Sequence, residues 1–273
     1  MVTYSDNEIQ VLGSPVKRSN RKWIWLIPII VIGSVLLLFC FIHNEETVDI
    51  KHFKTELNAP PPRKPESEMT SGVEYESYLV NDVWLYGFKL LDMQAELTLD
   101  ISEYTDSTEC FIMQAADIRK DNGKFVGDFV LNGKKLSSGK SKKGYCAIVD
   151  GKVTIGMSTD DEVMNHCIAN EGSFFRQYPL IINGQIQKNP IKGKSIRRAL
   201  AKNEDGLYIV MTDERESVHN FSEALLDMGM QDAISLVGGN KAYMYWRQDD
   251  DYWESDDLSK VTNNNFIVFK RKE

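Results

Sequence analysis

The sequence predicts an α+β fold, in which a single globular domain with a mixed sheet containing a βαβ unit follows one transmembrane helix. Three observations lead to this prediction. Residues 23–42 form an apolar run without charge, and short segments rich in aromatic and β-branched residues recur downstream. Residues 205–239 have the pattern of a strand, a helix and a second strand. We therefore expect a single-pass membrane protein that carries one folded domain.

The composition excludes some classes of function. The chain has 273 residues, of which 42% are hydrophobic and 26% are charged, which suits one good-sized domain plus an anchor. Its net charge is −8. Because nucleic-acid phosphates bind basic surfaces, we expect no nucleic-acid partner.

Residues 23–42, WIWLIPIIVIGSVLLLFCFI, have the length of a membrane-spanning helix. At about 1.5 Å per residue they span roughly 30 Å, the thickness of the bilayer core. The segment 17–22 before them is basic and the residues after them are acidic, so residues 1–22 are expected in the cytosol. A cleaved signal peptide is the alternative, although this run is long for one and Phe39–Ile42 lacks small residues. The predicted location is the lipid bilayer through residues 23–42, with the C-terminal domain extracytoplasmic.

Residues 43–71 are predicted to form a Pro-rich linker between the membrane and the domain. The stretch 58–69, NAPPPRKPESEM, contains half of the prolines among polar residues. Such a segment is extended and semi-rigid. The folded domain is therefore predicted over residues 72–273.

The cysteines do not form a disulfide scaffold. Cys40 lies in the apolar run, and only Cys110, Cys146 and Cys167 lie outside it. These three allow at most one disulfide and have apolar neighbours, so buried thiols are the simpler interpretation.

Strands and turns are predicted along most of the domain. Aromatic and β-branched residues indicate the strands, and Asx-Gly pairs indicate the turns. The predicted strands are 83–90, 95–101, 109–115, 124–131, 145–149, 153–156 and 180–182. Thr159–Glu162 fits a capping box, followed by a helix with an apolar face.

The segment 205–239 predicts a βαβ unit. Leu207–Met211 and Ala233–Val237 are apolar strands, and a helix that ends at Gly229 lies between them. Such a unit has parallel strands and a right-handed crossover, and ligands tend to bind beyond the carboxyl ends of its strands. Gly238 and Gly239 lie at such an end, where a missing Cβ lets the backbone approach a ligand. A sharp turn is the alternative interpretation of the two glycines.

The order of these pieces over roughly residues 105–245 resembles the phosphodiester glycosidase family. The best match runs from Arg197 to the segment 232–242, DAISLVGGNKA, where the family has a run similar to DALNLDGGGSS. Tyr178–Gly184 looks like the family's P-x-L-I-x-x-G strand. Cys110–Ile118 with Gly127–Gly133 looks like its N-G-G-F-F segment and the strand that follows. The resemblance implies a hydrolase that acts on a sugar phosphodiester or an exopolysaccharide-type glycan.

The chain departs from the family pattern at several positions. Val237 replaces the Asp before the glycines, Lys241 and Ala242 replace two Ser residues, and Gln114–Ala116 replaces Asn-Gly-Gly. An aliphatic side chain carries neither a proton nor a cation. An active enzyme therefore needs another carboxylate near Val237.

The chemistry that the resemblance implies suggests candidate site residues. Cleaving a sugar–phosphate ester calls for a cation at the phosphate and an acid/base group. Arg197 is the predicted phosphate ligand, with a structural ion pair as its alternative, and Arg198 points elsewhere if the segment is extended. Asp117 and Asp213 are the predicted catalytic carboxylates, with turn positions as their alternative. The other predicted substrate-binding residues are Gln114, Gly238, Gly239, Asn240 and Lys241.

No metal site or cofactor is predicted. His166 and His219 lie far apart in sequence, and no nucleotide-binding or Gly-x-Ser-x-Gly motif is present. A divalent cation is left open, since the acidic stretch 249–257 is either a solvated loop or a site for calcium or a basic partner. The expected ligand is a carbohydrate or a sugar phosphate. Three functions follow: a tethered hydrolase, a degenerate relative that binds glycan without turnover, and an interaction domain of an envelope complex.

Overall fold

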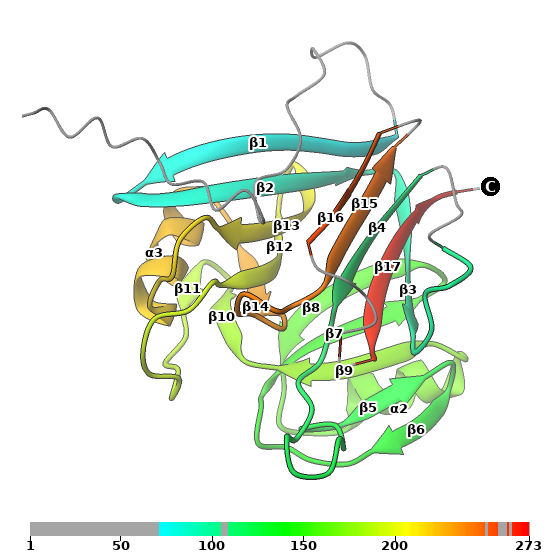
Figure 1. Ribbon diagram of the computed structural model, residues 1–273. Helices are drawn as coiled ribbons and strands as arrows, with labels where there is room; N and C mark the ends of the chain where they lie inside the picture. The colour runs from blue at the N-terminus through cyan, green and yellow to red at the C-terminus, as the bar shows by residue number, and fades with distance from the viewer. Residues whose placement is uncertain (1–70, 105–108, 249–250, 256–260, 262–263, 273) are drawn as a thin grey trace, which may run out of the picture. The chain divides into compact units, whose positions relative to one another are not determined.

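The computed structural model describes residues 71–104, 109–248, 251–255, 261 and 264–272. These residues belong to one compact unit, and strands outnumber helices in it (Figure 1). The helices described are α2 (Glu162–Ala169) and α3 (Val218–Asp227). Neither helix has the length and apolar character needed to cross a membrane. The predicted span 23–42 and nearly all of the predicted linker lie outside the described residues.

The strands form three sheets, each named here and listed in spatial order. The seven-stranded sheet contains β1 (Gly72–Val80), β2 (Val83–Leu91), β13 (Gly206–Thr212), β12 (Arg198–Asn203), β14 (Asp232–Ser235), β10 (Pro179–Ile182) and β11 (Gln185–Ile186). The β4 sheet contains β16 (Asp251–Glu254), β15 (Met244–Gln248), β4 (Glu109–Gln114), β17 (Phe266–Arg271) and β3 (Met93–Thr98). The β9 sheet contains β6 (Lys134–Ser137), β5 (Phe129–Leu131), β9 (Ser173–Gln177), β7 (Gly144–Val149) and β8 (Lys152–Met157).

The hairpin predicted at Asp150-Gly151 is confirmed. Val149 of β7 pairs with Lys152 of β8, so the two turn residues join the strands directly. Both turn residues have positive φ, 49° for Asp150 and 71° for Gly151. Two-residue hairpin turns favour this backbone conformation because it matches the twist of the strands.

The predicted mixed sheet is wrong, since every ladder between the described strands of the seven-stranded sheet is antiparallel. Helix α3 connects β13 to β14, and these two strands run parallel to each other. They are not neighbours, because β13 pairs with one edge of β12 and β14 pairs with the other. Strand β12 forms a hairpin with β13 and so occupies the place beside it, and α3 carries the chain past β12. The βαβ pattern therefore predicted the elements correctly but not their pairing.

The capping box predicted at Thr159 is also wrong. The N-cap of α2 is Asp161, and its side chain makes no capping hydrogen bond. Instead, the N–H of Glu162 donates to Oδ1 of Asp160 at 3.1 Å. The N-cap therefore lies two residues after Thr159, because a tight turn precedes the helix.

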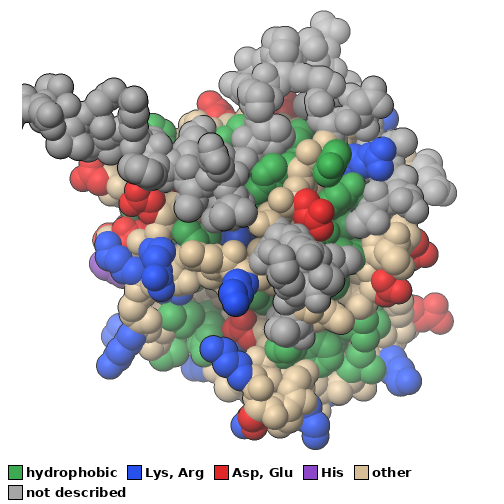
Figure 2. Space-filling model, viewed as in Figure 1, with side chains coloured by type: hydrophobic (Ala, Val, Ile, Leu, Met, Phe, Trp, Pro, Cys, Tyr) green, Lys and Arg blue, Asp and Glu red, His purple; other side chains and the backbone are tan. Residues whose placement is uncertain are grey.

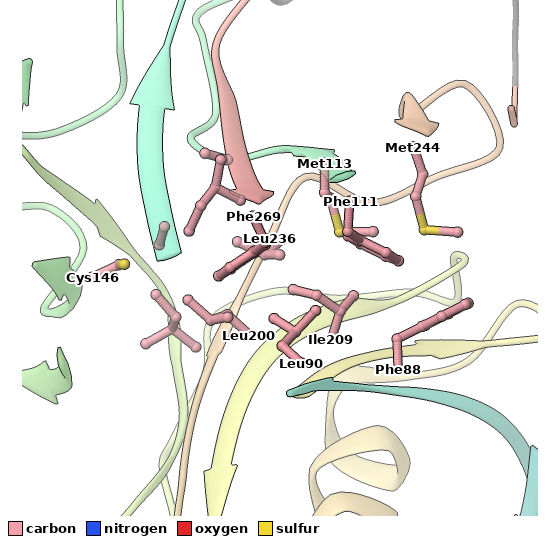
Figure 3. Close-up of a cluster of buried hydrophobic side chains, with 14 of the residues drawn as sticks. Phe88, Leu90, Phe111, Met113, Cys146, Leu200, Ile209, Leu236, Met244 and Phe269 are labelled. Atoms are coloured by element: carbon pink, nitrogen blue, oxygen red, sulfur yellow. The ribbon is translucent and has the colours of Figure 1, made fainter. Parts of the chain in front are cut away.

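One hydrophobic core joins the three sheets. Phe88 and Ile209 come from the seven-stranded sheet, Phe111 and Phe269 from the β4 sheet, and Cys146 from the β9 sheet (Figure 3). The other face of the seven-stranded sheet packs against the apolar side of α3. Because the sheets share this core, the ends of their strands meet near one another.

The three cysteines outside the apolar run are free and buried. Burial raises the pKa of the Cys110 thiol to about 11. A thiol held neutral in this way packs as a small apolar side chain.

Candidate functional site

A hollow of about 180 Å³, here called the Arg198 hollow, lies where strands of the three sheets end. Ala115 follows β4, while Gln177 ends β9 and Ser235 ends β14. The lining residues are Asp117, Tyr178, Leu180, Ile191, Ser195, Arg197, Arg198, Val218, Phe221, Ser235, Leu236 and Gly238. The hollow is therefore built by segments from all along the domain.

A polar network joins these strand ends. The ammonium of Lys142 forms an ion pair with Asp117 and donates to Oε1 of Gln177 at 2.8 Å. Gln177 donates from Nε2 to the carbonyl of Ala115 at 3.2 Å, and the hydroxyl of Ser235 reaches its Oε1 at 3.5 Å. Asp117 lines the hollow with 41% of its side chain exposed, while Lys142 beneath it is almost fully buried. The network thus holds one accessible carboxylate at the wall of the hollow.

Lys142 reaches the interior because of its neighbours. A Cβ on Gly144 would meet the carbonyl oxygen of Gln177 at 2.7 Å, so only glycine lets the chain pass this close. The ammonium of Lys142 also lies 4.9 Å from the centre of the Tyr178 ring, a cation–π distance. Burial lowers the pKa of Lys142, and the nearby Asp117 carboxylate opposes that shift. Burial and the Asp117 carboxylate therefore shift the pKa of this lysine in opposite directions.

Arg198, the first residue of β12, is the group in the hollow whose charge is least compensated. Its side chain is 1% exposed, and Nη1 donates to the carbonyl of Gly239 at 2.8 Å. Nε and Nη2 are also shielded from solvent and have no hydrogen-bond acceptor. Burial lowers the pKa of its guanidinium to about 10, and no carboxylate of the described residues pairs with it. A buried cation with two guanidinium nitrogens that lack acceptors is suited to bind an anion with several oxygens.

Arg197, the phosphate ligand predicted from sequence, lines the same hollow but uses its guanidinium differently. Nε donates to the carbonyl of Glu216 at 2.8 Å, and Nη2 donates to the carbonyl of Gly193 at 2.6 Å. These bonds join two loops on the side of α3. The prediction of an arginine at the hollow therefore stands, but the idle donors belong to Arg198.

The glycine pair has a packing role. A Cβ on Gly238 would meet the carbonyl oxygen of Ile196 at 2.6 Å, and Gly239 has a φ of 90° that other residues rarely adopt. The N–H of Gly239 donates to the carbonyl of Ile196 at 2.9 Å. The turn so formed presents the Gly239 carbonyl to Arg198. The missing Cβ at Gly238 thus makes room for the protein's own backbone.

Asp213, the second predicted catalytic carboxylate, does not line the hollow. Its Oδ1 accepts a hydrogen bond from the hydroxyl of Tyr86 at 3.0 Å, and its N–H donates to the carbonyl of Trp84. Burial, together with the charge of Asp213, raises the pKa of Tyr86 above its usual value. The structure therefore brings only one of the two predicted carboxylates, Asp117, into the hollow.

The remaining predicted substrate-binding residues lie apart from the lining. Gln114 is buried, and its Oε1 accepts from the N–H of Tyr243 at 2.9 Å. Asn240 and Lys241 are exposed and follow the glycine turn. In the described ranges, no three His, Cys, Asp or Glu residues lie close enough together to hold a metal ion.

Sequence reasoning singled out neither Lys142 nor the buried guanidinium of Arg198. The available signal for Lys142 was a pair of lysines directly before a glycine and an apolar strand. For Arg198 the signal was its position in the strand. It lies two residues before Leu200 and so on the same face of β12, and Leu200 points into the shared core. Ala199 and Ala201 on the opposite face are buried too, so alternation alone could not choose between the arginines.

Basic side chains outnumber acidic ones in the lining of the hollow. Figure 2 shows Lys and Arg side chains spread over the viewed face, including the part where α3 lies in Figure 1. Among the lining residues two arginines accompany one carboxylate, which Lys142 already pairs. The hollow therefore carries net positive charge in a protein of net negative charge.

Comparisons with known proteins found one matching family and solved structures with a similar fold. A model of the phosphodiester glycosidase family matches residues 111–269. The catalytic domain of zebrafish N-acetylglucosamine-1-phosphodiester alpha-N-acetylglucosaminidase, auto-inhibited by its pro-peptide, has a similar fold. Its TM-score is 0.52 at 14% sequence identity, over 76% of this chain and 85% of that chain. A hypothetical protein from Synechocystis matches with a TM-score of 0.55 at 10% identity, over 73% of this chain and 62% of that chain. No curated protein matches the sequence.

Proposed function

The chain belongs to the phosphodiester glycosidase family, and from this we propose that it is a membrane-anchored hydrolase of a sugar phosphodiester. The observation that carries the proposal is the buried Arg198 guanidinium, whose Nε and Nη2 lack acceptors at a hollow that also contains a carboxylate. The similar zebrafish fold belongs to an enzyme named for cleaving an N-acetylglucosamine-1-phosphodiester. We extend that class of substrate to this chain.

Arg198 is proposed to bind the phosphate of the substrate. Two parallel N–H donors of a guanidinium match two oxygens of a phosphate, and such charge-assisted bonds are short and strong. Arg198 already sits in a low-dielectric wall, so its attraction for an anion is weakened little by water. As negative charge builds on the departing phosphate, this attraction grows, and that difference is what lowers a barrier.

Asp117 is proposed to activate water. In the proposed step the water oxygen attacks the anomeric carbon, and the proton of the water passes to the Asp117 carboxylate. The bond between that carbon and the phosphate oxygen breaks, and its electron pair leaves with the phosphate. Lys142 holds the carboxylate in position from below.

A single carboxylate is sufficient for this step. Hydrolysis between two sugars needs one group to protonate the leaving oxygen and a second to assist attack. A phosphate is a much weaker base than a sugar alkoxide, so it can leave with a cation for support in place of a proton. Val237, where the family has Asp, then removes a group for which Asp117 can substitute.

Binding without turnover is the second candidate function. It is favoured by Val237 and by the fact that Asp117 is the one acidic residue among those lining the hollow. In that case Arg198 would retain the phosphodiester glycan while hydrolysis is lost. The same variants distinguish the two functions.

The anchor is part of the proposal because of residues 23–42. Their length and lack of charge suit a bilayer, and the basic segment before them suits the cytosolic side. The domain would then meet its glycan outside the cytosol.

The test is release of N-acetylglucosamine from its methyl phosphodiester by the full-length protein in detergent. We expect the rate to fall about a hundredfold or more in Arg198→Met and in Asp117→Asn, which remove the cation and the base. The adjacent Arg197→Met is the matched control and is expected to retain the rate within about threefold, since its guanidinium bonds only to loops.

Equal loss in Arg197→Met and Arg198→Met would contradict the assignment of the phosphate to Arg198. Binding of the diester without release of sugar by the wild-type protein would favour the second candidate function. Absence of both binding and release would overturn the proposal.

A further inference from the structure

A second cavity adjoins the Arg198 hollow. It has a volume of about 300 Å³ and lies between β11, the loop that follows β11 and the first turns of α3. Ile191 and Val218 line both spaces, so these two side chains are the wall that the spaces share. The second space is here called the α3 cavity.

The α3 cavity differs from the hollow in chemistry. Its apolar surface comes from Ile186 and from the shared Ile191 and Val218. Its polar groups are Gln187, Lys188, Asn189, His219 and Ser222, and no carboxylate lines it. Apolar surface beside side chains that donate and accept hydrogen bonds suits a sugar ring, whose C–H faces pack on aliphatic side chains while its hydroxyls form hydrogen bonds.

Asn189 provides an independent observation. Its Nδ2 donates to the carbonyl of Pro179 at 3.2 Å, which fixes the orientation of the amide. Its Oδ1 is shielded from solvent and accepts no hydrogen bond. A buried acceptor without a donor is unfavourable, so a hydroxyl from a ligand that donates to Oδ1 would complete its hydrogen bonding.

We propose that the α3 cavity binds the neutral, hydroxylated group on the far side of the phosphate, with Asn189 accepting a hydrogen bond from one of its hydroxyls. This rests on the proposed function, because it assumes that the phosphate occupies the Arg198 hollow. The ligand then spans both spaces across Ile191 and Val218. Asn189 becomes a specificity-determining residue for the leaving group of the diester.

The experiment measures binding of two probes to the full-length protein in detergent by calorimetry. Inorganic phosphate fills the hollow alone, whereas glucose 6-phosphate carries a hydroxylated ring on its phosphate. The variants are Asn189→Ala and His219→Ala, whose side chain lines the cavity and is 71% exposed. Asn220→Ala, an exposed asparagine on the same helix that lines neither space, is the matched control.

We expect glucose 6-phosphate to bind wild-type protein about tenfold more tightly than inorganic phosphate. Asn189→Ala should weaken glucose 6-phosphate by about fivefold to tenfold, the effect of one hydrogen bond, and leave phosphate unchanged within about twofold. His219→Ala should weaken glucose 6-phosphate alone by about twofold to threefold, and Asn220→Ala should change neither probe.

The outcomes separate the two proposals. If inorganic phosphate does not bind wild-type protein, the proposed function fails. If phosphate binds but glucose 6-phosphate binds no more tightly, the inference about the α3 cavity is overturned while the proposed function stands. Should Asn189→Ala fail to fold, an unchanged glucose 6-phosphate affinity in His219→Ala overturns the inference as well.

Discussion

Two arginines in this protein are buried to the same extent but have opposite surroundings. Arg176 and Arg198 are each 1% exposed. Arg176 donates from Nε to Asp128 at 2.6 Å, and from Nη1 and Nη2 to the carbonyls of Ser158 and Asp160 at 2.7 and 2.8 Å. Arg198 donates once, to the carbonyl of Gly239, and its Nε and Nη2 have no acceptor.

The difference separates a structural charge from a functional one. Burying a cation is costly unless a counter-ion and hydrogen bonds compensate it. Around Arg176 the compensation is complete, so that site joins β9, β5 and the turn before α2 into one unit. Around Arg198 the charge is only partly compensated, so its burial is unfavourable. An anion in the hollow would complete the compensation. Perturbing the two arginines in the same way tests this comparison.

The largest expected effect is from Arg176→Met. The replacement leaves the carboxylate of Asp128 buried, together with two carbonyls that lose their donors. We expect the free energy of unfolding to fall by about 3–5 kcal/mol, the usual cost of removing one partner of a buried pair. Urea denaturation of the full-length protein in detergent, followed by the fluorescence of the domain's tryptophans, measures it. A loss below about 1 kcal/mol would mean that the site is not structural.

An effect of opposite sign is expected from Arg198→Met. Methionine removes an uncompensated charge and leaves one carbonyl, that of Gly239, without its donor. We expect the free energy of unfolding to stay level or to rise by about 1 kcal/mol, measured in the same denaturation experiment. Inorganic phosphate should raise the melting temperature of the wild-type protein but not that of the variant, because ligand binding stabilises only the competent site.

If Arg198→Met lowered the free energy of unfolding by about 2 kcal/mol or more, Arg198 would be a structural residue like Arg176. The proposed difference between the two arginines would then be wrong. Should phosphate stabilise both proteins equally, the anion would bind elsewhere.

The smallest expected effect concerns acid stability. Burial by itself would raise the pKa of Asp128, but hydrogen bonds from Arg176, the Gly139 N–H and Lys135 outweigh it and hold that pKa below its usual value. The stability that this carboxylate contributes is therefore fully present at neutral pH, and it is lost as the pH falls below about 5 towards the lowered pKa. We expect Asp128→Asn to be less stable than wild type at pH 7 and to lose less stability between pH 6 and pH 3.

Denaturation at a series of pH values checks this prediction. Asp205→Asn is its control, because Asp205 is an exposed turn residue whose carboxylate forms no ion pair with the described residues. Parallel acid curves for wild type and Asp128→Asn would contradict the prediction.

Much of the fold could be predicted from the sequence because its signals are local. Runs of apolar, aromatic and β-branched residues identified β2, β7 and β13, and the Asp150-Gly151 pair identified a turn, in which both residues have positive φ. The failures concern relations between distant segments. Strand β14 pairs with β12 rather than with β13, and no local pattern records which edge of β12 is vacant.

The candidate site shows the same limit more sharply. The sequence placed a carboxylate at Asp117 and an arginine at Arg197, and both do line the hollow, together with Arg198, which the sequence reading directed elsewhere. It could not show that Lys142, 25 residues after Asp117, reaches beneath that carboxylate. It also grouped Asp213 with the site, whereas the Tyr86 hydroxyl, 127 residues away in sequence, binds that carboxylate outside the hollow.

By itself the sequence determined the positions of several strands and turns, the apolar run at 23–42 and the resemblance to the phosphodiester glycosidases, because each depends on residues near one another along the chain. Only the tertiary structure decided which of the two arginines has N–H groups without acceptors. Both faces of β12 are buried, so the chain's alternation sends Arg197 and Arg198 in opposite directions without showing which direction lacks partners. That depends on the loops of Gly193 and Glu216 lying on one side and the Gly239 turn on the other.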